Sequence, residues 1–308
     1  MSWRLAGRPL RRVLITRLRY LGDIVMSTVV VDALRRGDGG MEIGYLCEAD
    51  HGAVLANHED LTSIHLLDAT RRGRDARARQ SRTSGFPQAN AVGNTWATAR
   101  MLRAADYDLA VDLFFNPRSA WLLRLSGIPL RIGGTRSWRR RLYTHTVVDP
   151  PGIDSAPGFA AMAPGAMGAH LCRLAPLHHV ESGLDFIPWL EREYAGRRML
   201  PALSRTPLTE LAGEALRGTS LEITDPFLLL APGATWPTKE WPIQRWRELV
   251  AILRETLELP LLILAPPGAE DRWFDLTSDM PLGEKAYLPA LDLASALSLV
   301  VPRGGWSP

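Results

Sequence analysis

The chain has 308 residues, of which 46% are hydrophobic and 22% are charged, with a formal net charge of +3. This length suits two domains of roughly 100 to 200 residues each, and the composition excludes wholesale disorder. Only two cysteines occur, Cys47 and Cys172, which excludes a disulfide framework and fits a reducing cytoplasm. The sequence shows neither the apolar core of a signal peptide nor an apolar run of about 18 residues, so we expect a protein that is neither secreted nor membrane-spanning.

The first half of the chain alternates short apolar runs with helical patterns. This alternation is typical of a parallel sheet covered by helices. The predicted strands cover 12–16, 42–47, 63–68, 107–114, 130–134 and 144–149, and the predicted helices cover 24–36, 96–105 and 119–125.

The second half repeats the pattern after a charged, proline-containing junction at 190–206. We therefore predict an α/β protein with domains at 1–195 and 206–308. Two α/β halves that face a cleft are also found in dehydrogenases and periplasmic-type binding proteins, so the pattern alone leaves the function open. The predicted elements are strands at 226–232 and 259–266, helices at 241–257 and 268–276, and a short helix that runs into a strand over 291–301.

The first chemical motif follows the first strand, where Gly22 and Asp23 precede a helical pattern. In one interpretation Asp23 is an N-cap that accepts backbone N–H groups, and Gly22 supplies the tight turn. In the other, the carboxylate lies at the carboxyl end of the strand, where ligands of open α/β sheets bind, and removes a proton from a hydroxyl. The local pattern leaves both interpretations open.

The second motif is the segment "LLLAPGATWPTKEWPIQRW" at 228–246. Lys239 stands just before a helix that is predicted to start near Pro242, and Thr235 and Thr238 add hydroxyl donors. A helix start with a nearby lysine favours phosphate binding over an ordinary surface loop. Neither a Walker sequence nor GxGxxG is present, which argues against a P-loop NTPase or a dinucleotide-binding fold.

Taken in order, these motifs resemble the heptosyltransferases of glycosyltransferase family 9, which add heptose to the inner core of lipopolysaccharide. The resemblance rests on "RVLITRLRYLGDIVMSTVVVDALRR" (12–36), on "YDLAVDLFFNPRSAWLLRLSGIPLRIGG" (107–134) and on "PTKEWPIQRWRELV" (237–250). It implies the GT-B fold, in which an acceptor-binding and a nucleotide-sugar-binding domain, both Rossmann-like, face a cleft.

The resemblance also implies roles for individual residues. Asp23 corresponds to the general base, and Lys239 corresponds to the partner of the donor diphosphate, with Thr235 and Thr238 beside it. Glu270 falls near an acidic position that contacts the ribose. A sixth residue, Arg118, either holds an anionic acceptor or caps the sheet edge.

The implied reaction is inverting transfer of heptose from ADP-heptose to a lipopolysaccharide core acceptor, without metal or cofactor. The implied location is the cytoplasm, with peripheral contact at the inner face of the cytoplasmic membrane. Asp106, Tyr107 and Asp108 spell a DxD motif, but it precedes a strand, so we interpret it as a surface turn. Cys47 with His51, and His178 with His179, lack the four ligands of a zinc site and are expected to be structural.

Six arginines lie close together between Arg71 and Arg82. They predict either a solvated loop or a contact with phosphate or an anionic membrane. Nucleic-acid binding is not expected, because no aromatic residues are interleaved and no reading motif is present.

The resemblance ends at Val301. In the family, the matching strand leads into an Asp-x-Gly-x-x-His segment that binds the donor, whereas "PRGGWSP" follows here. We therefore expect a second domain that is truncated at its C-terminus. The alternative function is accordingly an inactive remnant, or a nucleotide-sugar-binding module of the same fold.

Overall fold

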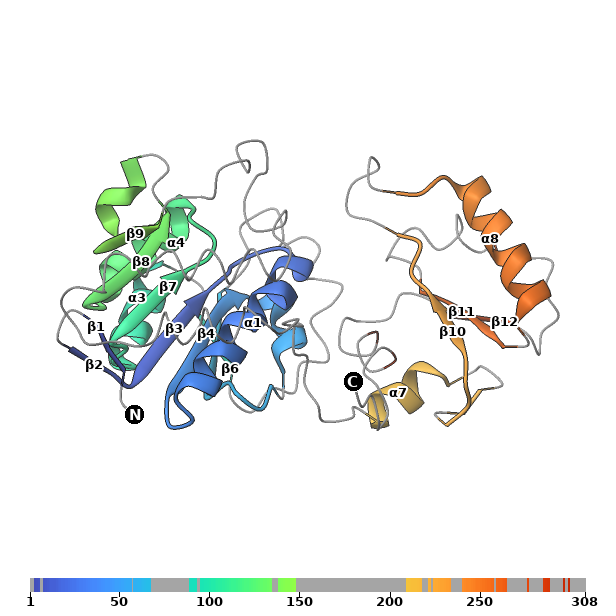
Figure 1. Cartoon of the computed structure of the whole chain (residues 1–308), viewed down its shortest axis with the longest axis horizontal. Coiled ribbons are helices and arrows are strands. Elements are labelled where there is room, and N and C mark those ends of the chain that lie inside the picture. Colours follow the sequence, from blue (N-terminus) through green and yellow to red (C-terminus); the bar gives the residue numbers. More distant parts are fainter. Residues whose placement is uncertain are drawn as a thin grey trace. The chain divides into compact units, whose positions relative to one another are not determined.

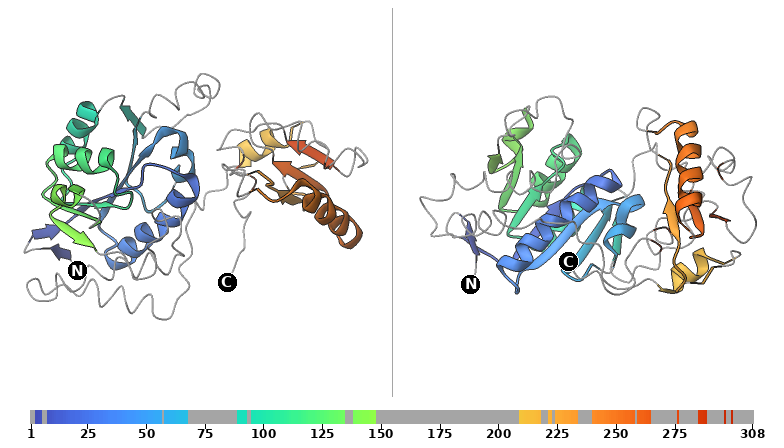
Figure 2. Two further views of the ribbon diagram at one scale, coloured as in Figure 1. Left: turned by 90° about the horizontal axis from the view of Figure 1, so that it is seen from above. Right: turned by 45° about the vertical axis from the view of Figure 1, so that its right-hand side comes forward.

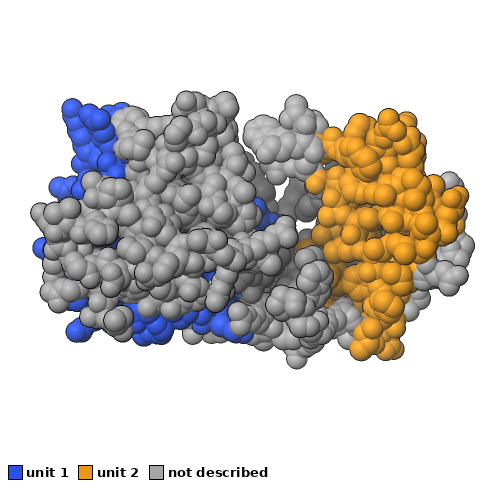
Figure 3. Space-filling view, viewed as in Figure 1, with its two compact units in different colours: residues 1–205 blue, residues 206–308 orange. Residues whose placement is uncertain are grey.

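The computed structural model describes 3–5, 8–56, 58–67, 89–92, 95–134, 138–147, 209–217, 221–222, 224–233, 240–257, 259–264 and 285–288, together with Leu276, Ala296 and Leu299. The chain divides into two compact units, residues 1–205 and residues 206–308, which are coloured separately in Figure 3.

Unit 1 is built around a seven-stranded sheet with the order β6-β5-β4-β3-β7-β8-β9, in which all neighbouring strands are parallel (Figure 1). A short antiparallel pair, β1 (Trp3–Leu5) and β2 (Arg8–Leu10), precedes it. The strands of the main sheet are β3 (Arg12–Thr16), β4 (Glu42–Glu48), β5 (Ser63–Leu67), β6 (Ala89–Val92), β7 (Leu109–Asp112), β8 (Leu130–Gly134) and β9 (His145–Val147).

Helices cover both faces of this sheet. The chain steps from β3 to β4 in one direction and from β7 to β8 in the other, and right-handed crossovers then place the connecting helices on opposite faces. Accordingly, α1 lies on one face, while α3 and α4 pack together on the other (Figure 2). The helices are α1 (Leu21–Gly37), η1 (Ala49–Leu55), α3 (Thr95–Ala104), α4 (Pro117–Ser126) and η2 (Trp138–Leu142).

The strand order reverses between β3 and β7, and this reversal defines where a ligand can bind. β3 is the central strand, and its residues Val13, Leu14 and Ile15 are fully buried because helices cover both sides. In open α/β sheets, ligands bind outside the carboxyl ends of the strands at such a reversal point. A ligand-binding site is therefore expected at the carboxyl ends of β3 and β7.

Unit 2 contains a three-stranded parallel sheet with the order β10-β11-β12, sandwiched between two helices. One face packs on Val250 of α8, and the other packs on Ala212 and Leu216, in and just after α7. Adjacent residues of β11 serve opposite faces, Ile263 toward α8 and Leu262 toward α7. The elements are α7 (Thr209–Ala215), β10 (Leu228–Leu230), α8 (Ile243–Thr256), β11 (Leu261–Leu264) and β12 (Lys285–Leu288).

The predicted strands and helices that fall on described residues agree with this architecture, whereas the sequence did not predict β1, β2, η1, β6, η2, α7 or β12. The α/β class and the parallel sheets are confirmed, and α8 starts directly after Pro242, as the sequence predicted. The segments 268–276 and 291–301, where further helices were expected, lie almost entirely outside the described residues. Within the described residues, every helix is too short or too polar to cross a membrane.

Candidate active site

Asp23 lies in the first turn of α1, with its carboxylate buried next to a guanidinium. The helix begins at Leu21 after Tyr20, which has a φ of 64° and no side-chain capping bond. The N-cap interpretation of Asp23 was therefore wrong, and so was the assignment of the turn to Gly22, because Tyr20 makes the turn. The carboxylate instead pairs through Oδ2 with Nη2 of Arg17, and both side chains are almost fully buried.

Arg17 connects this carboxylate to the loop that follows β7. Its Nη1 donates to the carbonyl of Leu113 at 2.9 Å, and its guanidinium lies 4.8 Å from the centre of the Phe114 ring. Such a contact is a cation–π interaction, which gains strength away from water. The pair of Arg17 and Asp23 thus sits where β3 and β7 end side by side, at the reversal of strand order.

Asp112, the last residue of β7, shapes the loop that receives Arg17. Its Oδ1 accepts from the backbone N–H of Phe114 at 2.9 Å and of Phe115 at 3.2 Å, and its Oδ2 accepts from the Tyr143 hydroxyl at 2.7 Å. Complete burial raises the pKa of Asp112, an effect that these hydrogen bonds and one from Ser119 oppose. Burial and the neighbouring Asp112 also raise the pKa of Tyr143.

The sequence did not single out Asp112. It ends the apolar run "LAVD", so its position at the carboxyl end of a strand was the available signal. That signal becomes visible only when β7 is known to lie beside β3.

A second carboxylate, Glu48, lies at the carboxyl end of β4 and was also missed. Its Oε1 accepts from Nε of Arg19 at 2.8 Å and from Nη1 of Arg118 at 2.9 Å, and Glu48 is only 5% exposed. Arg118 is in the first turn of α4, which Asn116 caps with a capping box. The three side chains carry one net positive charge, in a position that suits an anion.

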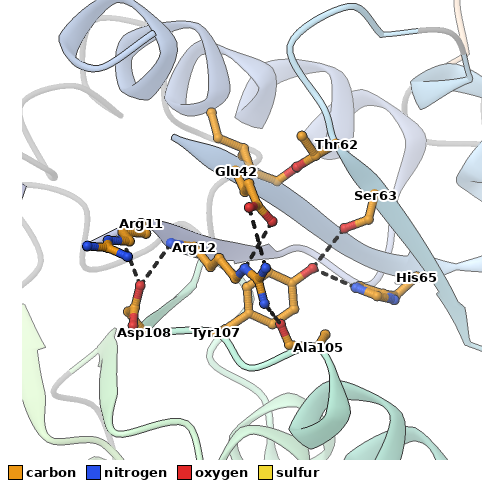
Figure 4. Close-up of polar contacts among 10 residues, drawn as sticks. Arg11, Arg12, Glu42, Thr62, Ser63, His65, Ala105, Tyr107 and Asp108 are labelled. Carbon is orange, nitrogen blue, oxygen red and sulfur yellow. Dashed lines mark hydrogen bonds and ion pairs between the residues drawn. The ribbon is translucent and has the colours of Figure 1, made fainter. Parts of the chain in front are cut away.

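The DxD segment lies at the opposite edge of the sheet (Figure 4). The Tyr107 hydroxyl contacts Ser63 Oγ at 2.8 Å and His65 Nε2 at 2.7 Å, and Asp108 accepts from the backbone N–H groups of Arg11 and Arg12. Tyr107 is buried, so the surface-turn interpretation was wrong for this residue. A side chain at Gly44 would overlap the Tyr107 hydroxyl, which explains the glycine in the middle of β4.

Metal-binding clusters are absent from the described residues, where no group of three or more potential ligands comes together. Burial raises the pKa of the Cys47 thiol and lowers the pKa of His51. His178 and His179 lie outside the described residues, as does the arginine cluster at 71–82.

The predicted donor-binding residues Thr235, Thr238, Lys239 and Glu270 also lie outside the described residues. The structure does describe what flanks the first three: β10 ends at Leu230, and α8 begins after an N-cap proline that makes no side-chain capping bond. The segment therefore joins the carboxyl end of a strand to the start of a helix, as phosphate-binding loops do.

Comparison with known proteins finds similarity to the same family. The family model of glycosyltransferase family 9 (heptosyltransferase) matches residues 201–299. Lipopolysaccharide heptosyltransferase 1 of Pseudomonas aeruginosa is 25% identical over 251 residues, which cover 77% of this chain but only 56% of that protein.

Solved structures agree at the level of the fold. A family 9 glycosyltransferase from Veillonella parvula matches with a TM-score of 0.65 and 16% identity, over 94% of this chain and 72% of its own. The ADP-heptose lps heptosyltransferase II of E. coli matches with a TM-score of 0.63 and 16% identity, over 94% of this chain and 76% of its own.

The match of both α/β units to these structures shows the GT-B fold. The family model matches residues in its second unit, and the curated relative aligns along most of its length, so the chain is similar to members of glycosyltransferase family 9.

Proposed function

We propose that this protein transfers heptose from ADP-heptose to an acceptor in the inner core of lipopolysaccharide, by an inverting mechanism without metal. The observation that carries the proposal is Asp23, a buried carboxylate at the reversal point of the unit 1 sheet in a chain that resembles heptosyltransferases. Unit 1 would bind the acceptor and unit 2 would bind the nucleotide sugar.

Asp23 is proposed as the general base. Arg17 engages Oδ2, which leaves Oδ1 as the oxygen that would accept the proton. The acceptor oxygen attacks the anomeric carbon as Asp23 takes its proton, and the bond from that carbon to the diphosphate oxygen breaks from the opposite side. The bonding electrons leave with ADP.

On the donor side, the developing charge on the diphosphate needs cationic partners. Lys239 supplies a full charge, Thr235 and Thr238 supply hydroxyl donors, and the start of α8 supplies backbone N–H groups. Glu270 would hold the ribose. This set requires no metal, which agrees with the contacts of the DxD segment at the other edge of the unit 1 sheet.

On the acceptor side, Arg118 would contact an anionic group of the core sugar. Glu48 Oε1 accepts from both Arg118 and Arg19, so the Arg118 guanidinium is already oriented before the acceptor arrives. Two similar proteins are heptosyltransferases of lipopolysaccharide, and we propose that the reaction of this protein takes place in the cytoplasm at the inner face of the membrane.

Calorimetric titration with ADP tests the donor site. The wild type should bind with micromolar affinity, and Lys239→Ala should weaken binding by about ten- to a hundredfold, because it removes a charged hydrogen-bond donor. Arg254→Gln is the matched control, since it removes one charge from the last turn of α8 and should leave the affinity unchanged.

The same preparation separates an enzyme from a binding module. Release of ADP from ADP-heptose in the presence of a lipopolysaccharide core acceptor identifies the enzyme, whereas ADP binding without transfer identifies the module. A wild type that binds no ADP would exclude the proposed function.

A further inference from the structure

The outer surface of α4 and η2 in unit 1 combines exposed tryptophans with arginines. Trp121 is 44% exposed and Trp138 is 53% exposed, although both are large aromatic residues. Their ring centres lie 6.3 Å apart, so the two side chains form one patch although they come from different elements. Figure 1 shows η2 next to α4 above β8 and β9.

The stretch of chain that contains α4 and η2 carries basic but no acidic residues. From Leu113 to Val148 the chain contains seven arginines and no aspartate or glutamate. Arg124, Arg140 and Arg141 are exposed. Burial lowers the pKa of Arg131, and the nearby charge of Arg124 lowers it further. Nearby cations repel one another, so an anionic partner would be favourable at this surface.

We infer that Trp121 and Trp138, together with Arg124, Arg140 and Arg141, form a surface that docks on an anionic membrane. Tryptophan is enriched at membrane interfaces, where its ring is apolar and its N–H is polar, and arginine is attracted to acidic lipid headgroups. Hereafter these five residues are called the docking surface.

The position of the docking surface in the fold fits this occupant. α4 follows β7 and η2 follows β8, so both begin at the carboxyl edge of the sheet, where Asp23 lies. Trp138 begins η2 and lies toward that edge, whereas Arg124 is in the last turn of α4, away from it. Contact of Trp138 with a membrane therefore brings the carboxyl edge close to an acceptor carried by lipid. In this one respect the inference rests on the proposed function.

Co-sedimentation of the full chain with phosphatidylcholine vesicles, with and without phosphatidylglycerol, tests the inference without donor or acceptor. The wild type should bind only the vesicles that contain phosphatidylglycerol, and added salt should weaken the binding. Replacement of the three arginines by glutamine (R124Q/R140Q/R141Q) should lower partitioning on the order of a hundredfold. Replacement of both tryptophans by alanine (W121A/W138A) should lower it roughly tenfold.

Controls in unit 2 parallel both changes, with three arginines against three and one tryptophan against two. R245Q/R247Q/R254Q removes three exposed arginines from α8, and W241A removes a tryptophan that is 45% exposed. Both controls should partition like the wild type. The thermal unfolding midpoint of each variant should stay close to that of the wild type, which separates lost docking from lost folding.

The inference is overturned if the wild type ignores anionic vesicles, or if both docking-surface variants bind as the wild type does. It is also overturned if substitution of the arginines at 71–82 alone abolishes binding, or if the same variants lose affinity for single-stranded oligonucleotide rather than for vesicles. Vesicle binding in a protein that binds no ADP would instead reject the proposed function and keep the docking surface.

Discussion

The two edges of the unit 1 sheet both carry dense polar contacts, but they place charge differently. At the carboxyl edge the ion pair of Arg17 and Asp23 is buried, with side-chain exposures of 3% and 6%. At the amino edge the ion pair of Arg12 and Glu42 is 42% and 52% exposed, and the buried contacts there join neutral hydroxyls and His65 (Figure 4).

This difference bears on the proposed site of chemistry. A buried ion pair contributes little net stability, because desolvation of its two charges offsets their attraction. Stability alone therefore does not account for a buried ion pair at this edge. This contrast supports the proposal that the chemistry takes place at the carboxyl edge and that the contacts at the amino edge serve the fold.

The largest expected effect on stability comes from breaking the buried ion pair at the carboxyl edge. Breaking the exposed ion pair at the amino edge is the comparison. Arg17→Met leaves Asp23 buried without a counter-charge and should lower the free energy of unfolding by about 3 to 5 kcal/mol. Arg12→Gln breaks the exposed pair and should cost under about 1 kcal/mol. Urea denaturation followed by circular dichroism measures both, and equal losses would contradict the distinction between the edges.

The next effect is a dependence on pH that belongs to the amino edge. Burial lowers the pKa of His65 from 6.5 to about 4. The unfolded chain therefore takes up a proton before the folded one does, so stability is lost as pH falls from 6.5 toward 4, on the order of 3 kcal/mol in all. His65→Gln should remove this part of the loss in urea titrations at neutral and acidic pH, and an unchanged slope would refute the assignment.

The smallest effect separates two buried tyrosines. Tyr143→Phe and Tyr107→Phe each remove one hydroxyl with a buried partner, so each should cost about 1 to 3 kcal/mol of unfolding free energy. Only Tyr143 bonds to Asp112, which holds the loop that receives Arg17. Tyr143→Phe should therefore also slow transfer several-fold, whereas an equal slowing by Tyr107→Phe would show that both edges affect catalysis.

Much of the fold was predictable because apolar runs define the strands of a parallel sheet. The start of α1 was not, since Tyr20 makes its turn with a positive φ that is uncommon outside glycine. Glu48 and Asp112 were missed because each closes an apolar strand and looks like an ordinary strand end. Their role depends on which strands are neighbours, and a local pattern does not contain that information.

Asp23 shows the opposite case. The sequence offered two interpretations, and the geometry removes one, because its carboxylate faces Arg17 rather than the backbone of its own helix. Its role as general base remains the central proposal.

The most direct test compares the rate of ADP release by Asp23→Asn and Glu42→Gln, with ADP-heptose and a lipopolysaccharide core acceptor. Each change removes one carboxylate that pairs with an arginine, one at each edge. Asp23→Asn should slow transfer by roughly a hundredfold or more while ADP affinity is retained, and Glu42→Gln should leave the rate unchanged. A folded Asp23→Asn variant that transfers heptose at the wild-type rate would contradict the account.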